Sequence, residues 1–273
     1  MGTSKSSAGS PSKVPMVPPW VPDVEGDDKS KEPSVTGDAV EDPSLSATVP
    51  IAPQGRFNST RRSLGKFVKS GSEGSLKKGV GRYFKNGLGG AGTATKRFGG
   101  TAANAGALYS ALGDRDSRGD DSPIDKALSE GKTGKQVIDA VIESVCPING
   151  SQDTESARNA MNDAFSELLS KYPQADLADL SESERNFVIV NYVSIDVYRR
   201  FILDVGDKFR KNAVSPAVAV SRMKQAKEYI KETIAASFKS LAKGSTKVAG
   251  KGISKIVRIA LRNAFLVFAE YAE

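Results

Sequence analysis

The stretch 187–209 restricts the fold more than any other part of the chain, because it is apolar on most sides. Its apolar residues, among them Val188, Ile195 and Phe201, are not confined to one stripe, as they are on a helix that faces solvent. We interpret this stretch as the central helix of a domain, surrounded by other helices. The β-branched residues in 187–195 leave a strand as the alternative, although the length of the segment favours a helix.

Regular apolar spacing on both sides of this stretch predicts further helices. Asp153 is expected to cap a helix with one apolar face, and Ser181 with Glu184 makes a capping box ahead of the central helix. The last helix is expected over 253–271, with an apolar surface wide enough to be sandwiched in a bundle or offered to a partner. The chain is therefore predicted to be mainly α, with an α-helical bundle over residues 122–273.

A basic, glycine-rich segment occupies residues 56–113. Each glycine inside a helix costs about 1 kcal/mol relative to alanine, so helices here are expected to order only against a partner or the later core. Small residues would then allow the helices to approach closely. Gly87, Gly89 and Gly92 fit the dinucleotide pattern G-x-G-x-x-G, but no buried strand precedes them, and we assign no nucleotide site.

Charge is distributed unevenly along the chain. Residues 21–42 carry eight acids against two lysines, and residues 54–100 carry eleven basic residues against one glutamate. The two segments are expected to associate with each other, or the basic one to bind an acidic partner. Interleaved aromatic residues make nucleic acid a candidate partner of residues 56–100; the alternatives are a solvated basic face and contact with a membrane surface. The candidate contacts with an anionic partner are Arg61, Arg62, Lys66, Lys77, Lys78 and Arg82.

Residues 1–55 are rich in Ser, Pro, Gly and Asp and are predicted to be disordered. Gly2 is small enough for Met1 to be removed, which would expose a flexible α-amine. Further on, ahead of the acidic linker, valines and the only tryptophan stand in a proline frame. Such an extended apolar strip is typical of peptides that dock in a partner's groove. The residues expected to contact a partner there are Val17, Pro18, Pro19 and Trp20.

The residue inventory argues against an autonomous enzyme. The chain has no histidine, and its single Cys146 can form neither an internal disulfide nor a Cys-rich metal site. Asp196 and Arg200 are spaced as an ion pair on a helix surface, and a buried functional role is the alternative. The same holds for Asp204 and Lys208. We predict no catalytic residue, metal or cofactor. No secretory segment and no run of about 18 apolar residues is present, so a soluble, cytoplasmic protein is expected.

The order of these parts is itself distinctive. The chain starts Met-Gly-Thr-Ser and continues with Val-Pro-Met-Val-Pro-Pro-Trp-Val-Pro-Asp over 14–23 and the acidic linker. Arg-Arg-Ser-Leu-Gly-Lys-Phe-Val follows over 61–68, with a Gly-rich block that reaches Tyr109 and a helical C-terminal domain. This arrangement resembles the QatB family of the bacterial Qat anti-phage defence system, most strongly over 1–23 and 61–112.

The resemblance implies a non-enzymatic subunit of a defence complex, whose helical domain mediates assembly. The other members of such a system look like an ATPase, a QueC-like (deazaguanine-synthase-like) enzyme and a TatD-like nuclease. The QueC-like enzyme is expected to couple a deazaguanine group to the amine of an exposed N-terminal glycine. On this chain the acceptor would be Gly2, with Thr3 and Ser4 as the adjacent recognised residues. A nucleic-acid-binding protein is the main alternative, and a membrane-active effector is the weakest.

Overall fold

The computed structural model describes residues 12–19, 21, 50–113, 122–242 and 250–273. Within these residues the only pairing of extended segments is an isolated antiparallel bridge between Pro15 and Ile51, and the rest of the regular structure is helical. The prediction of a mainly α fold is therefore confirmed. The helices are α1 (Asn58–Ser70), α2 (Glu73–Arg82), the π-helix η1 (Tyr83–Gly87), α3 (Gly90–Arg97), α4 (Gly99–Ala111), α5 (Pro123–Ser129), α6 (Gly134–Val145), α7 (Gln152–Lys171), α8 (Glu182–Val205), α9 (Asp207–Asn212), α10 (Pro216–Ala242) and α11 (Gly250–Glu270).

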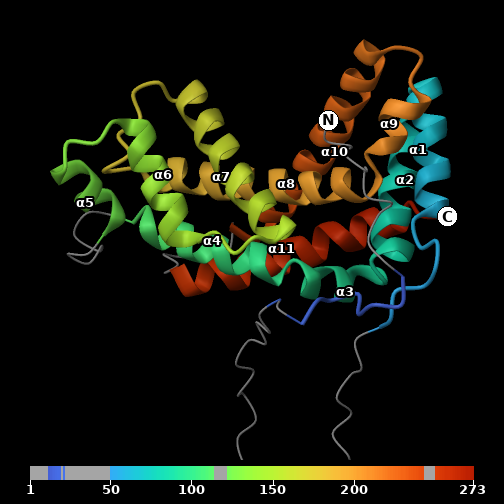
Figure 1. Ribbon diagram of the computed structural model, residues 1–273, viewed down its shortest axis with the longest axis horizontal. Coiled ribbons are helices and arrows are strands. Elements are labelled where there is room, and N and C mark those ends of the chain that lie inside the picture. The colour runs from blue at the N-terminus through green and yellow to red at the C-terminus, as the bar shows by residue number, and fades with distance from the viewer. Residues whose placement is uncertain (1–11, 20, 22–49, 114–121, 243–249) are drawn as a thin grey trace, which may run out of the picture.

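Helix α8 lies in the middle of the molecule. Figure 1 shows α7 and α10 as the two arms of a V on one side of α8, with α4, α3 and α11 along the other side. Helix α8 packs on α7, α10 and α4, while α11 packs on α4, α3 and α10. One continuous apolar core runs from Phe57 to Phe268. The central position predicted for the 187–209 stretch is confirmed.

The ends of the helices follow local hydrogen bonding. The Ser181 hydroxyl accepts from the Glu184 amide, and the Glu184 carboxylate accepts from the Ser181 amide, as the capping box predicts. The predicted cap of α7 is off by two residues, because Ser151 and not Asp153 accepts from the Thr154 amide, at 3.1 Å. Asp153 lies in the first turn instead, where its charge favours the helix dipole.

The apolar stretch is divided between two helices. Helix α8 ends at Val205, and α9 begins after Gly206. A Cβ at Gly206 would lie 2.5 Å from the Ile202 carbonyl oxygen, so only glycine fits this close turn. Phe209, the last residue of the predicted helix, is fully buried from α9. The strand considered for 187–195 is wrong, because those residues are helical throughout.

The glycine-rich segment orders against the later core. At Gly81 a Cβ would lie 2.4 Å from the Phe268 carbonyl oxygen, so glycine lets α2 approach α11 closely. The ring of Phe84 stacks on Phe265 and Phe268 of α11, at centroid distances of 4.3 and 5.0 Å. Helix α4, which is rich in alanine, packs between α11 and α8. Its small apolar side chains are therefore part of the core.

Candidate functional site

The proline-framed strip is attached to the helical body through its backbone. The Lys13 amide donates to the Ala52 carbonyl, and the Ala52 amide donates to the Val14 carbonyl, both at 2.8 Å. The Met16 amide donates to the Pro50 carbonyl, also at 2.8 Å. Residues 13–16 are therefore paired with residues 50–52, which lie shortly before α1 in the sequence. Residues on the two sides of the acidic linker are held together.

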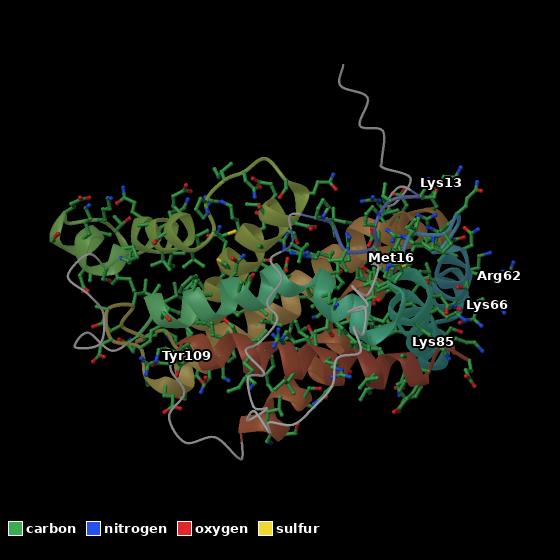
Figure 2. All side chains as sticks on the ribbon, turned by 90° about the horizontal axis from the view of Figure 1, so that it is seen from below. Lys13, Met16, Arg62, Lys66, Lys85 and Tyr109 are labelled. Carbon is green, nitrogen blue, oxygen red and sulfur yellow. The ribbon has the colours of Figure 1, made fainter. Side chains whose placement is uncertain are left out.

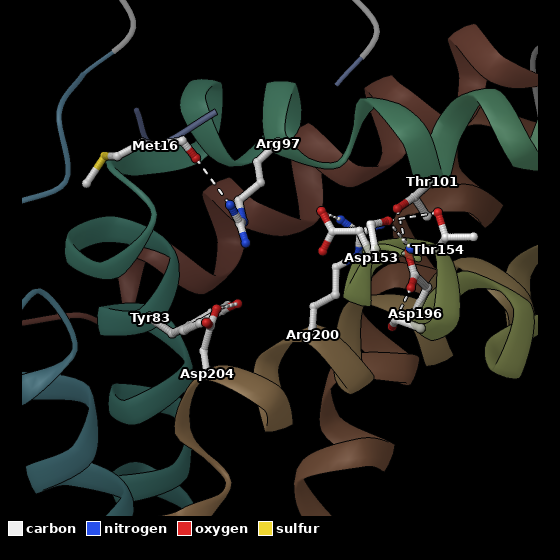
Figure 3. Close-up of polar contacts among 11 residues, drawn as sticks. Met16, Tyr83, Arg97, Thr101, Asp153, Thr154, Asp196, Arg200 and Asp204 are labelled. Carbon is white, nitrogen blue, oxygen red and sulfur yellow. Dashed lines mark hydrogen bonds and ion pairs between the residues drawn. The ribbon is translucent and has the colours of Figure 1, made fainter. Parts of the chain in front are cut away.

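Met16 anchors this strip on α3. Its side chain is buried, and its sulfur lies only 2.6 Å from the position that a Cβ of Gly89 would occupy. Gly89 also has a φ of 76°, so glycine is required there both for space and for backbone conformation. The Arg97 guanidinium donates to the Met16 carbonyl oxygen at 3.4 Å, as Figure 3 shows. The end of α3 and its preceding turn form the seat of the strip.

The structure places only part of the predicted recognition strip. Val17 and Pro18 are half-buried beside Met16, and Pro19 is exposed. The other predicted residues, Gly2, Thr3, Ser4 and Trp20, lie outside the described residues. Met16 was not among the predicted contacts, although its apolar side chain within the proline frame was the available signal.

We expect Met16→Asp to release the strip from α3 while the helices stay folded. Burial of a methionine side chain contributes about 1.5 to 3 kcal/mol, and the charged replacement would also have to be desolvated. Tryptic cleavage after Lys13 should accelerate by roughly tenfold or more, because it follows the population of the open strip. Ser12→Asp, at an exposed neighbouring position, is the control. An unchanged cleavage rate for the Met16 variant would contradict the anchoring role.

A buried polar cluster lies beneath this region, centred on Asp196. Its carboxylate accepts hydrogen bonds from the hydroxyls of Thr101 (2.6 Å) and Ser156 (2.8 Å) and from Arg200 Nε (3.2 Å). Arg200 also pairs with Asp153 at 3.3 Å. The cluster joins α4, α7 and α8, as Figure 3 shows. The pair of Asp196 with Arg200 is confirmed, but its expected place on the helix surface is wrong, since Asp196 is fully buried.

The charges in this cluster balance each other. Burial opposes the positive charge of Arg200, but Asp196 and Asp153 outweigh it and hold the pKa of the guanidinium above its ordinary value. The guanidinium also lies over the Phe98 ring, 5.1 Å from its centroid. With each oxygen of Asp196 occupied by a donor, the carboxylate is engaged in holding three helices together rather than presented to a substrate.

A cavity of about 220 Å³ opens between the strip and this cluster. Val21, Arg97, Arg200 and Cys146 are among its lining residues. Burial raises the pKa of the Cys146 thiol, so the reactive thiolate form is disfavoured at neutral pH. Within the described residues no group of histidine, cysteine or acidic side chains is arranged to hold a metal, and no helix is long and apolar enough to cross a bilayer.

Asp204 forms a second buried contact. Its carboxylate accepts from the Tyr83 hydroxyl at 2.9 Å, which ties α8 to η1 across 121 residues of sequence. Burial first, and then the charge of Asp204, raise the pKa of Tyr83 well above its ordinary value. The predicted surface pair with Lys208 is therefore wrong, because Asp204 turns inward to a tyrosine that the spacing rule cannot reveal.

The six predicted anionic-partner contacts fall on two different surfaces. Three of them line an open cleft beside α9: Arg61, Arg62 and Lys66. The other three point elsewhere. Lys77 pairs with Glu73 at 2.6 Å, and Arg82 donates to the Ala272 carbonyl and the Ser63 hydroxyl. Lys78 is half-buried on the same helix, α2. The cleft also contains four basic residues that were not predicted from the sequence: Lys69, Lys208, Arg210 and Lys211. The last three lie far from the basic segment in the sequence.

Comparison with known proteins gives one match. The family model described as Qat anti-phage system associated protein QatB matches residues 89–268. No functionally curated protein matches the chain, and no solved structure does. The matched range covers well over half of the chain and includes α4, the whole Asp196 cluster and most of α11. The chain therefore belongs to the QatB family of the Qat anti-phage system.

Proposed function

We propose that this protein is a non-enzymatic subunit of a Qat defence complex and that the α-amine of Gly2 is the acceptor for a QueC-like partner enzyme. Family membership makes the other Qat components the expected partners. The single observation that supports a substrate role is the anchored strip. It holds the chain to α3 at Met16, which lies fourteen positions after Gly2 in the sequence.

The anchor limits where a partner can work. Gly2 lies ten positions before Ser12, the first residue that the structure describes, so full extension gives a reach of about 35 Å. An enzyme that takes the amine of Gly2 into its active site must therefore bring that site within about 35 Å of Ser12. An α-amine has an ordinary pKa of about 7.7 to 8.0, so a useful fraction is neutral and nucleophilic at physiological pH. The helical domain would contribute the assembly surface in this scheme.

We expect Gly2→Glu to abolish N-terminal deazaguanine conjugation. A large second residue blocks removal of Met1, so the glycine amine is never exposed. Intact-mass measurement of the protein, co-expressed with the other Qat components, checks this directly. Ser6→Glu places the same charge nearby without changing the N-terminal residue and should still be conjugated. An unmodified wild-type N-terminus together with full phage defence by Gly2→Glu would refute the proposal.

A further inference from the structure

We propose that the cleft between α1 and α9 binds the phosphate backbone of a nucleic acid. The cleft has a volume of about 1010 Å³ and is open to solvent. Its walls are α1 on one side and the end of α8 with α9 on the other. Of the residues that the structure describes, seven arginine and lysine side chains line it, against two carboxylates. Such an excess of one sign, concentrated in a concave surface, attracts a polyanion.

Helix α1 supplies a regular row of cations. Arg62, Lys66 and Lys69 are exposed and follow one another at helical spacings of four and three residues, so they lie on one face. Figure 2 shows Arg62 and Lys66 pointing away from the helices at one end of the molecule. The row is about 10 Å long at 1.5 Å per residue, which spans roughly three nucleotides of one strand. No acidic residue occurs in α1, and none of the described carboxylates pairs with these three side chains.

Helix α9 supplies the opposite wall. Lys208, Arg210 and Lys211 all line the cleft. Arg210 and Lys211 share the carboxylate of Asp207, at 2.9 and 3.6 Å, so one negative charge serves two cations. This wall therefore stays positive although it is partly paired. Salt bridges at exposed positions are weak and are readily exchanged for phosphate contacts.

The two walls are held in a fixed relation. Arg61 donates to the Asp204 carbonyl oxygen at 3.2 Å, which fastens α1 to the end of α8. The rings of Phe67 and Phe209 meet at a centroid distance of 6.2 Å behind the cleft. Gly65 lies so close to Asn212 that a Cβ added at Gly65 would be in van der Waals contact with the Asn212 side chain. The cations are thus carried by packed helices and do not depend on a loop.

The lining of the cleft favours nucleic acid over a protein partner. Among the described residues that line it, the only apolar side chains are Ile202 and Leu203, and none is aromatic. Protein interfaces are enriched in aromatic anchors and depleted in lysine at their centres, which is the reverse of this composition. Phosphate groups require only positive charge and hydrogen-bond donors. Without aromatic side chains to stack on bases, binding should be independent of sequence and strongly dependent on salt.

The test measures DNA binding by fluorescence anisotropy with the full chain. Labelled single-stranded and duplex DNA of about 20 nucleotides serve as probes between about 50 and 200 mM salt. For Lys66→Gln/Lys69→Gln, the slope of log affinity against log salt should fall by about 2 in magnitude, and the affinity for duplex near 0.1 M salt should fall on the order of 50-fold. Lys208→Gln/Lys211→Gln should act in the same direction, because it alters the other wall. Comparing the two probes shows which form of nucleic acid the cleft prefers.

Lys77→Gln/Lys78→Gln is the matched control, since it removes the same charge from the basic segment but outside the cleft. It should leave the salt slope close to that of the wild type. Three results would overturn the proposal. They are no binding of either probe at low salt, an equal loss in the control variant, and competition by polyglutamate as effective as competition by DNA. The last result would assign the cleft to an acidic protein. None of these results depends on the fate of Gly2.

Discussion

Replacing Asp196 with alanine should lower the free energy of unfolding by about 3 to 5 kcal/mol, because it leaves the buried Arg200 without its main partner. Arg200 is only 6% exposed, so water can solvate little of its guanidinium in place of the lost carboxylate. The hydroxyls of Thr101 and Ser156 would lose their acceptor as well. Asp153 remains within 3.3 Å of Arg200, which places the expected loss toward the lower end of the range. Urea denaturation followed by circular dichroism measures the change.

Two companion variants separate burial from charge. Asp163→Ala removes the ion pair between Asp163 and Arg199, whose side chains are 44% and 35% exposed, respectively. Because this pair lies at the surface, its loss should lower the free energy of unfolding by less than about 1 kcal/mol. Asp196→Ala combined with Arg200→Met removes both charges and should recover much of the lost stability. Equal losses for the Asp196 and Asp163 variants would contradict a buried role. So would a double variant that is no more stable than Asp196→Ala alone.

Phe84→Ala is expected to cost about 3 to 5 kcal/mol as well, through a cavity at the centre of the stacked rings. Phe84 is fully buried and contacts Phe265 and Phe268 nearly face to face, with interplanar angles of 20° and 13°. It also meets the Tyr83 ring edge-on at 5.0 Å. Loss of this ring removes the main aromatic contact between η1 and α11. Urea denaturation again provides the measurement.

Phe187→Ala is the control for this prediction, because Phe187 is only half-buried and meets Tyr172 at the molecular surface. Phe187→Ala should lower the free energy of unfolding by clearly less than Phe84→Ala does. The Phe84 variant should in addition speed tryptic cleavage after Lys13, since η1 leads into the turn at Gly89 that seats Met16. A Phe84 variant with a loss no greater than that of Phe187→Ala would show that the stacked rings do not organise this part of the core.

Family membership was anticipated from one part of the sequence and is shown by another. The resemblance was strongest over 1–23 and 61–112, whereas the matched family range is 89–268. The two overlap only in the Gly- and Ala-rich block. The family assignment therefore does not depend on the N-terminal motif. The proposals for Gly2 and for the partner enzyme rest on the resemblance together with the anchored strip, and the mass measurement decides them.

The sequence by itself determined the class of the fold and the start of its central helix. Period and capping are local properties, so the capping box at Ser181 and the helical nature of 187–205 could be predicted correctly. The high glycine content near Gly81 correctly indicated close helix contacts, because only a missing Cβ permits them. The capping box and the helical period depend on residues within a few positions of each other, and a missing Cβ is a property of one residue.

Only the tertiary structure decided which charges are buried and which gather on one surface. Asp196 and Asp204 look like surface residues by spacing, yet Thr101 and Tyr83 meet them from helices about a hundred residues away. Arg62 and Lys208 are likewise brought to opposite walls of one cleft by the packing of α1 on α9. The physical reason is the same in both cases. The partner of a charge is fixed by long-range helix packing, which a one-dimensional spacing rule does not contain.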